Sequence, residues 1–222
     1  MVALIDVLLP PACAGCGGYG SLLCGTCRDA LDPPADDEDA FLAPDAGTVL
    51  GQHFVLAIAA FSHRGVAQRA LRRLKYGDAR RASGPLARAA LPAFRRLSAV
   101  SGPAALVPVP LHPERLRLRG YNQAALLAAE LARCSGARVW PGLRRARPTE
   151  RQHGLDRAAR LRNLSGAFRV EQRWMAASRN PPDTAILVDD ILTTSATMEA
   201  CAAVLAGAGI GSVYGFAIAR EV

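Results

Sequence analysis

The sequence predicts an α/β fold, a doubly wound parallel sheet with helices on both faces, preceded by a small cysteine module. From residue 53 onward, short apolar runs alternate with segments of helical periodicity. Half of the 222 residues are hydrophobic but only 5% are aromatic, so a core of Ala, Leu and Val is expected. Four of the six cysteines fall between positions 13 and 27.

The expected elements follow from local patterns. Runs of apolar residues predict strands, and apolar residues at three- and four-residue spacing predict helices. Strands are predicted at 53–61, 105–109, 185–188 and 213–218, and helices at 66–75, 82–97, 122–133 and 197–205. Between 143 and 173 the pattern breaks, with nine Arg and three acidic residues. That stretch is either a solvated loop or an insertion that covers a site.

Composition shifts predict the domain boundaries. Residues 1–31 form the cysteine module, 32–52 a linker and 53–222 the main domain, because 32–45 holds six acidic residues and no basic one. No run reaches the ~18–20 apolar residues of a membrane span. The apolar run 2–9 has no preceding basic residues, so it is interpreted as a packing segment rather than a secretory signal. We expect a cytoplasmic protein.

The charge balance favours anionic partners. The formal net charge is +8, and Lys75 is the single lysine among 27 basic residues. Part of this excess reflects a compositional preference for Arg over Lys. Even so, the arginine fork binds phosphate in a bidentate manner, which favours nucleotides or nucleic acid as partners.

The N-terminal cysteines form two C-x-x-C pairs, Cys13-Ala-Gly-Cys16 and Cys24-Gly-Thr-Cys27. Two residues between thiolates let both sulfurs bind one metal, and two such knuckles complete a tetrahedron. Structural zinc is the predicted cofactor, because it accepts four thiolates without redox chemistry. A cytoplasmic compartment argues against disulfides, and a redox pair lacks its usual βαβ surroundings. An iron–sulfur cluster has the same ligand count.

One segment combines carboxylates and hydroxyls between a strand and a helix. The predicted strand ends at Asp189 and Asp190, and a hydroxyl-rich turn precedes the helix. A helix N-terminus attracts phosphate through its unpaired N–H groups, and two carboxylates can accept hydrogen bonds from a sugar diol. The predicted phosphate-binding residues are Thr193, Thr194, Ser195, Ala196 and Thr197. Simple helix capping explains one hydroxyl but not the whole set.

This segment resembles the signature loop of the type I phosphoribosyltransferases. The resemblance implies that the two carboxylates, which we assign as catalytic, hold the ribose diol of phosphoribosyl pyrophosphate, and that the turn holds its 5-phosphate. Ser195 stands where that family usually has Gly, so its Cβ is expected either to crowd the phosphate or to restrict the turn, while its hydroxyl offers a further donor. The implied fold is a type I phosphoribosyltransferase-like doubly wound parallel sheet with an N-terminal zinc-knuckle module.

Further blocks, in order along nearly the whole chain, resemble the ComF family, which joins a four-cysteine zinc module to a phosphoribosyltransferase-like domain. Besides the four cysteines, the matching blocks are Leu74-Lys75-Tyr76-Gly77-Asp78, Val107-Pro-Val-Pro110, Arg119-Gly120-Tyr121-Asn122-Gln123, and a set from Thr149 to Phe168. Among them, Arg119, Asn122 and Lys75 are predicted to contact the substrate's phosphates. An exposed basic helix start is the alternative interpretation of the Arg119 block. For Lys75 the alternative is a charge that favourably ends its helix.

The resemblance implies a phosphoribosyltransferase that uses magnesium to neutralise the pyrophosphate. In related transferases a segment corresponding to 147–168 closes over the substrate. A sensor that binds the sugar diphosphate without turning it over is the alternative on the same fold. The family is associated with DNA uptake in natural transformation, so single-stranded DNA or DNA-uptake proteins are expected partners. Nothing in the sequence identifies the acceptor substrate.

Overall fold

The computed structural model describes residues 10–34, 41–42, 53, 55–76, 79–146, 164, 166–176, 181–193 and 195–221. The strands are β1 (Phe41–Leu42), β2 (Leu56–Ser62), β3 (Ala105–Pro108), β4 (Leu143–Arg145), β5 (Phe168–Val170), β6 (Thr184–Leu192) and β7 (Ser212–Arg220). The helices are α2 (Gly25–Asp29), α4 (Gly65–Tyr76), α5 (Ser83–Ser101), α6 (Pro113–Arg119), α7 (Gln123–Ser135) and α9 (Ala196–Gly207), with 3-10 turns η1 (Arg80–Ala82) and η2 (Gln172–Trp174).

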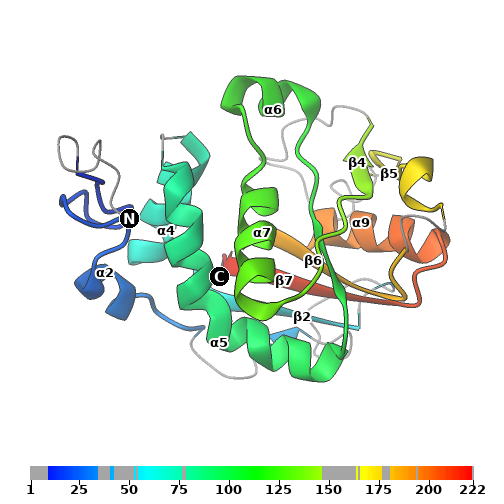
Figure 1. The fold of residues 1–222 in the computed structure, drawn as a ribbon, viewed down its shortest axis with the longest axis horizontal. Helices are drawn as coiled ribbons and strands as arrows, with labels where there is room; N and C mark the ends of the chain where they lie inside the picture. The colour runs from blue at the N-terminus through cyan, green and yellow to red at the C-terminus, as the bar shows by residue number, and fades with distance from the viewer. Residues whose placement is uncertain are drawn as a thin grey trace.

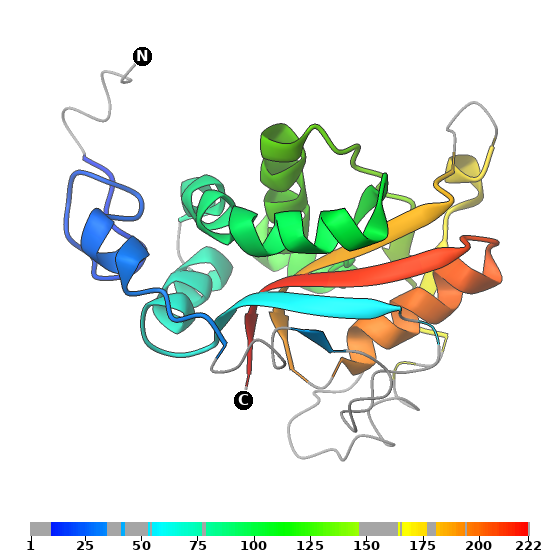
Figure 2. The same ribbon diagram turned by 90° about the horizontal axis from the view of Figure 1, so that it is seen from below.

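The central sheet has the strand order β1-β2-β7-β6-β3, of which Figure 1 labels β2, β7 and β6. Its four longer strands are mutually parallel, and β1 pairs with β2 in the antiparallel sense. Helices α5 and α7 cover one face and α9 the other, as Figure 2 shows. The prediction of an α/β fold with a parallel sheet covered on both faces is therefore confirmed.

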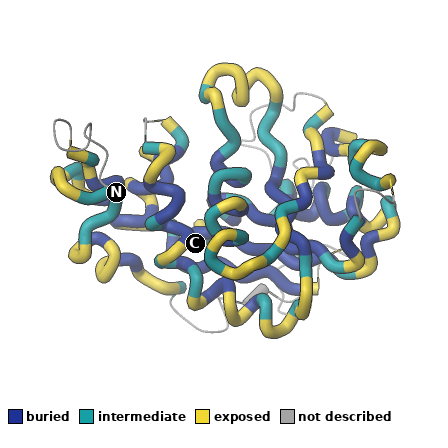
Figure 3. Tube along the Cα trace, viewed as in Figure 1, coloured by how far each residue is buried: buried dark blue, intermediate teal, exposed yellow. Residues whose placement is uncertain are grey.

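The core alternates between the two faces of the sheet along β6 as far as Val188. Ile186 and Val188 of β6 belong to the cluster that includes the buried residues of α5 and α7. Ala185 and Leu187 belong to the cluster formed with α9 and the indole of Trp140. This period of two, with every central position buried, produces continuous apolar runs in the sequence. In Figure 3 the strands are accordingly dark blue, whereas α6 is largely exposed.

Several boundaries differ from the prediction. The strand predicted at 185–188 extends to Leu192, so both carboxylates lie inside β6 rather than after it. The ladder with β3 does stop at Val188, but the ladder with β7 continues to the end of the strand. The stretch predicted as a linker contains β1, and the stretch that lacked a pattern contains the antiparallel pair β4 and β5. Strands of two or three residues are too short to show a recognisable periodicity in the sequence.

Candidate functional site

The candidate site lies at the carboxyl edge of the parallel sheet, where β6 extends beyond its neighbour β3. The last residue of β3, Pro108, pairs with Val188, and the Val109 N–H donates to the Val188 carbonyl at 2.9 Å. Asp189 and Asp190 therefore stand just past the end of β3. Ligands of open α/β sheets bind outside the carboxyl ends of the strands, and these carboxylates occupy that position.

Asp190 is enclosed by two elements on the α4 and α7 side of the sheet. It is only 3% exposed. One carboxylate oxygen lies 2.7 Å from the Lys75 Nζ, and the other accepts from the Gln123 Nε2 at 3.4 Å. The sequence predicted Lys75 as a phosphate ligand, and the structure pairs its ammonium with Asp190.

The two sequence blocks around Lys75 and Arg119 meet at this carboxylate. The Tyr121 hydroxyl donates to the Leu74 carbonyl, which ties the loop before α7 to the end of α4. The Arg80 guanidinium lies 4.4 Å from the Tyr121 ring centroid. Gly120 has a φ of 76°, and a Cβ there would lie 2.9 Å from an Arg80 nitrogen, so this loop approaches its neighbours closely because it lacks a side chain.

The predicted pyrophosphate ligands Arg119 and Asn122 take part in internal contacts. Arg119 donates to the Gln123 side-chain oxygen and lies 5.3 Å from the Tyr76 ring centroid. Asn122 caps α7, because its side-chain oxygen accepts from the Ala124 N–H at 3.0 Å. Its amide also donates to the carbonyl of the residue after β3, at 2.9 Å. The network thus runs from Arg119 through Gln123 to the buried carboxylate.

Asp189 faces the α9 side and is half-buried. Its carboxylate accepts from the Asp190 N–H at 2.8 Å. Burial, followed by the neighbouring negative charge of Asp190, raises the pKa of Asp189 well above its usual range. A half-buried acceptor at the end of a sheet can receive a hydrogen bond from a ligand hydroxyl.

Two titratable residues near this edge were missed from sequence. Arg145, at the end of β4, lies over the Phe168 ring at 5.4 Å, and burial followed by the charge of Arg115 lowers its pKa. His63 follows β2, and burial lowers its pKa. A three-residue strand gives Arg145 no usable signal, but the position of His63 directly after a predicted strand was visible.

The hydroxyl-bearing turn joins β6 to the N-terminus of α9. Thr193 is exposed, Ala196 is buried and Thr197 is half-buried, while Thr194 lies outside the described residues. Ser195 is the N-cap of α9 and has a φ of 55°. This is the left-handed conformation that favours glycine, the residue that the resemblance implies at this position.

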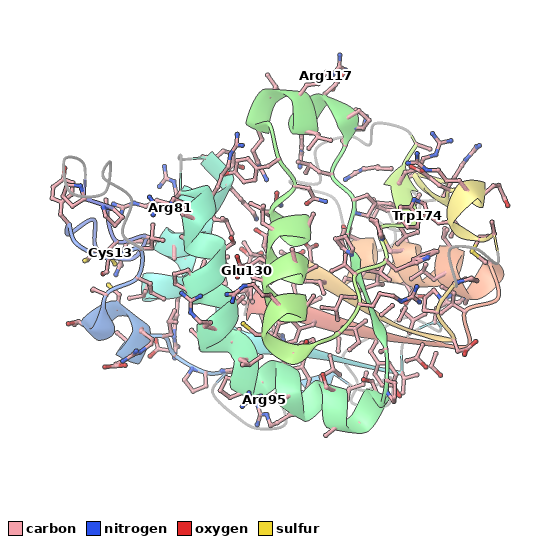
Figure 4. The ribbon with its side chains drawn as sticks, viewed as in Figure 1. Cys13, Arg81, Arg95, Arg117, Glu130 and Trp174 are labelled. Atoms are coloured by element: carbon pink, nitrogen blue, oxygen red, sulfur yellow. The ribbon has the colours of Figure 1, made fainter. Side chains whose placement is uncertain are left out.

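The four N-terminal cysteines gather into one cluster at the end of the molecule where Figure 4 labels Cys13. Their sulfurs all lie within 4.8 Å of one another, so they could together hold a metal ion. The Cys24 N–H lies 3.3 Å from the Cys13 sulfur, and the Gly18 N–H lies 3.4 Å from the Cys16 sulfur. Although burial acts in the opposite direction, backbone N–H donors lower the pKa of Cys13 to about 6. Cys13 therefore favours the thiolate form in which cysteine binds metals.

The cysteine module is bound to α4 through two arginines one helical turn apart. Arg69 donates to the Gly15 carbonyl at 2.8 Å, and Arg73 donates to the Cys13 carbonyl. Cys13 and Cys27 share the larger core cluster with buried residues of α4 and α5. The helix that supplies Lys75 to the site therefore also supports the cysteine cluster.

Most of the segment predicted to close over a substrate, including Thr149 and His153, lies outside the described residues. The same holds for Gly77 and Asp78 and for the apolar run 2–9. Within the part of the chain that the structure describes, no helix has the length and apolar character needed to cross a membrane.

Comparison with known proteins identifies several relatives, one of which matches nearly the whole chain. The chain is 31% identical over 218 residues to the DNA utilization protein YhgH of Salmonella typhi, covering 97% of this chain and 86% of that protein. It is 36% identical over 124 residues to Competence protein F of Haemophilus influenzae. The chain belongs to the ComF family. No family model matches it.

Other ComF relatives match over a shorter stretch. The DNA utilization protein YhgH of Escherichia coli K12 is 32% identical over 130 residues. The matched stretches cover 54% of that protein and 51% of the Haemophilus protein. The resemblance inferred from the motifs is confirmed at the level of the family.

Proposed function

We propose that this ComF protein binds the ribose 5-phosphate group of phosphoribosyl pyrophosphate at the carboxyl edge of β6, and that it is a phosphoribosyltransferase. The observation that carries the proposal is a half-buried carboxylate near the end of β6, followed by a left-handed turn and a helix N-terminus. Such a turn directs backbone N–H groups at an anion, and the carboxylate suits a sugar hydroxyl. We also propose that the fold is of the type I phosphoribosyltransferase class.

The proposed roles divide along the chain. Backbone N–H groups at the start of α9, with the hydroxyls of Thr193, Thr194 and Thr197, hold the 5-phosphate. Asp189 accepts from a ribose hydroxyl. Arg119 contacts the pyrophosphate, and the capping contacts of Asn122 fix the loop on which Arg119 lies. Magnesium, when bound with the substrate, supplies charge neutralisation of the leaving pyrophosphate.

We infer that the metal of the cysteine cluster is zinc. Zn–S bonds of about 2.3 Å in a tetrahedron place the sulfurs about 3.8 Å apart. The separation of the Cys16 and Cys24 sulfurs is 3.9 Å, which fits that geometry. Four thiolates leave no open coordination position, so the proposed role of the ion is structural.

The names of the relatives support a role in competence and DNA utilization. We propose that the chain acts beside internalised single-stranded DNA, through contact with the DNA or with DNA-uptake proteins. The positive net charge is compatible with such partners, whereas the scarcity of aromatic residues disfavours a surface that stacks bases.

Calorimetric titration of phosphoribosyl pyrophosphate with magnesium tests the binding. Detection of pyrophosphate after addition of bases or amines then tests the transfer reaction. Binding with pyrophosphate release identifies a transferase, and binding without release identifies the sensor. A wild-type protein that binds nothing at millimolar ligand refutes the proposed site.

A further inference from the structure

The adjacent carboxylates of β6 project toward different faces of the sheet. Side chains alternate along a strand, so Asp190 continues the row of Ile186 and Val188, and Asp189 continues the row of Ala185 and Leu187. The contacts of Asp190 with Lys75 and Gln123, on the α4 and α7 side, agree with this placement. Two carboxylates placed in this way have different surroundings.

Both oxygens of Asp190 already have partners within the protein. The ammonium of Lys75 reaches one oxygen at 2.7 Å, and the Gln123 amide reaches the other at 3.4 Å. The side chains of Lys75 and Asp190 are 21% and 5% exposed. A buried carboxylate with a cationic partner is costly to separate from it, because either charge alone would stay buried and unpaired.

The partners of Asp190 are themselves held in place. The hydroxyl of Tyr121 donates to the carbonyl of Leu74, directly before the lysine. Gln123 accepts from Arg119 and begins α7. The carboxylate thus joins the end of α4, the start of α7 and the end of β6, and β6 leads directly into the hydroxyl-bearing turn.

Asp189, unlike Asp190, is not ion-paired within the described part of the chain and is not fully buried. It is half-buried, and its hydrogen bonds are with the backbone N–H and the side chain of the adjacent Asp190. Among the residues that the structure describes, it forms no ion pair within 4.0 Å. An acceptor with remaining lone pairs and partial exposure can take a ligand hydroxyl without breaking a protein contact.

Building on the proposed function, we infer that the two carboxylates have separate roles. Asp190 is a structural residue, which Lys75 and Gln123 hold and which stabilises the packing of α4 and α7 against β6. Asp189 alone accepts hydrogen bonds from the ribose. The single lysine of the chain therefore serves the framework of the site rather than the phosphate.

Matched Asp→Asn variants test this division, because Asn keeps the size and one acceptor oxygen. For Asp189→Asn we expect the Kd for phosphoribosyl pyrophosphate with magnesium to rise about tenfold or more, with no decrease in Tm. For Asp190→Asn we expect a Tm lower by about 5 °C or more and a Kd change of less than about threefold, measured well below the Tm. Equal losses of affinity in both variants would overturn the inference.

A double-mutant cycle with Lys75→Met tests the pairing itself. Each single change leaves one buried charge unpaired, so Asp190→Asn combined with Lys75→Met should recover most of the Tm lost by either alone. Additive losses of Tm would show that the pair does not position Asp190 and would overturn that assignment. If the wild-type chain binds no ligand, the proposed function and the role of Asp189 fall together, while the cycle still decides the role of Lys75.

Discussion

Ser195 occupies a backbone conformation that an L-residue adopts only at a cost, and this gives a quantitative prediction. Among the described residues it is the non-glycine residue with positive φ, at 55°. The left-handed conformation costs such a residue about 1–2 kcal/mol of conformational free energy. A glycine avoids that penalty. It lowers the stability of the fold by about 0.4–1 kcal/mol, however, because it gives the unfolded chain more conformational entropy.

Ser195→Gly and Ser195→Ala form a matched pair, because both remove the hydroxyl and only Ala keeps the Cβ. The difference between the two terms favours the Gly variant by about 0.5–1 kcal/mol, or about 1–4 °C in Tm for a chain of this size. Thermal and urea unfolding of both variants in the absence of ligand measure it. An Ala variant as stable as the Gly variant would refute the strain assigned to this turn.

Three further outcomes are expected. Purified protein should contain one zinc per chain by elemental analysis, and Cys24→Ser should lose it whereas Cys134→Ser keeps it; iron in the wild-type chain would contradict this. A Cβ at Gly15 would lie 2.6 Å from a cysteine sulfur, so Gly15→Ala should cost about 1–3 kcal/mol of unfolding free energy, whereas Gly25→Ala, with no atom within 4 Å of its Cβ, should not. The pKa of Asp189 is raised in the folded state, so its ionisation opposes folding once the pH rises through that value. Asp189→Asn should therefore gain more stability over the wild-type chain in urea unfolding at pH 8 than at pH 4, and an equal difference at both would disprove the assignment.

The sequence predicted the parts of the fold that repeat a period over many residues. The strand 185–188 was recognised from its continuous apolar run, yet its extension to Leu192 was not, because Asp189 and Asp190 interrupt the run. The β7 ladder on one side holds those residues in the strand, and that contact is made with residues more than twenty positions later. Pairing between distant segments leaves no local signal.

In the candidate site, too, local motifs were predicted from sequence, whereas contacts between distant segments were not. The C-x-x-C spacing predicted a cysteine cluster, and the four sulfurs do gather. The residue blocks around Lys75 and Arg119 were recognised separately, but no local pattern could show that they meet at Asp190. Charge alone suggested phosphate as the partner of Lys75. A buried carboxylate supplied by a distant strand is the partner in the structure.

Calorimetric titration of phosphoribosyl pyrophosphate in the presence of magnesium tests the central claim most directly. We expect saturable binding with a Kd below about 1 mM, which corresponds to more than about 4 kcal/mol. Asp189→Asn should weaken it about tenfold or more, because one of the two carboxyl acceptor oxygens is lost from the ribose site. Absence of binding by the folded, metal-loaded wild-type chain at millimolar ligand, or unchanged binding by Asp189→Asn, would contradict the account.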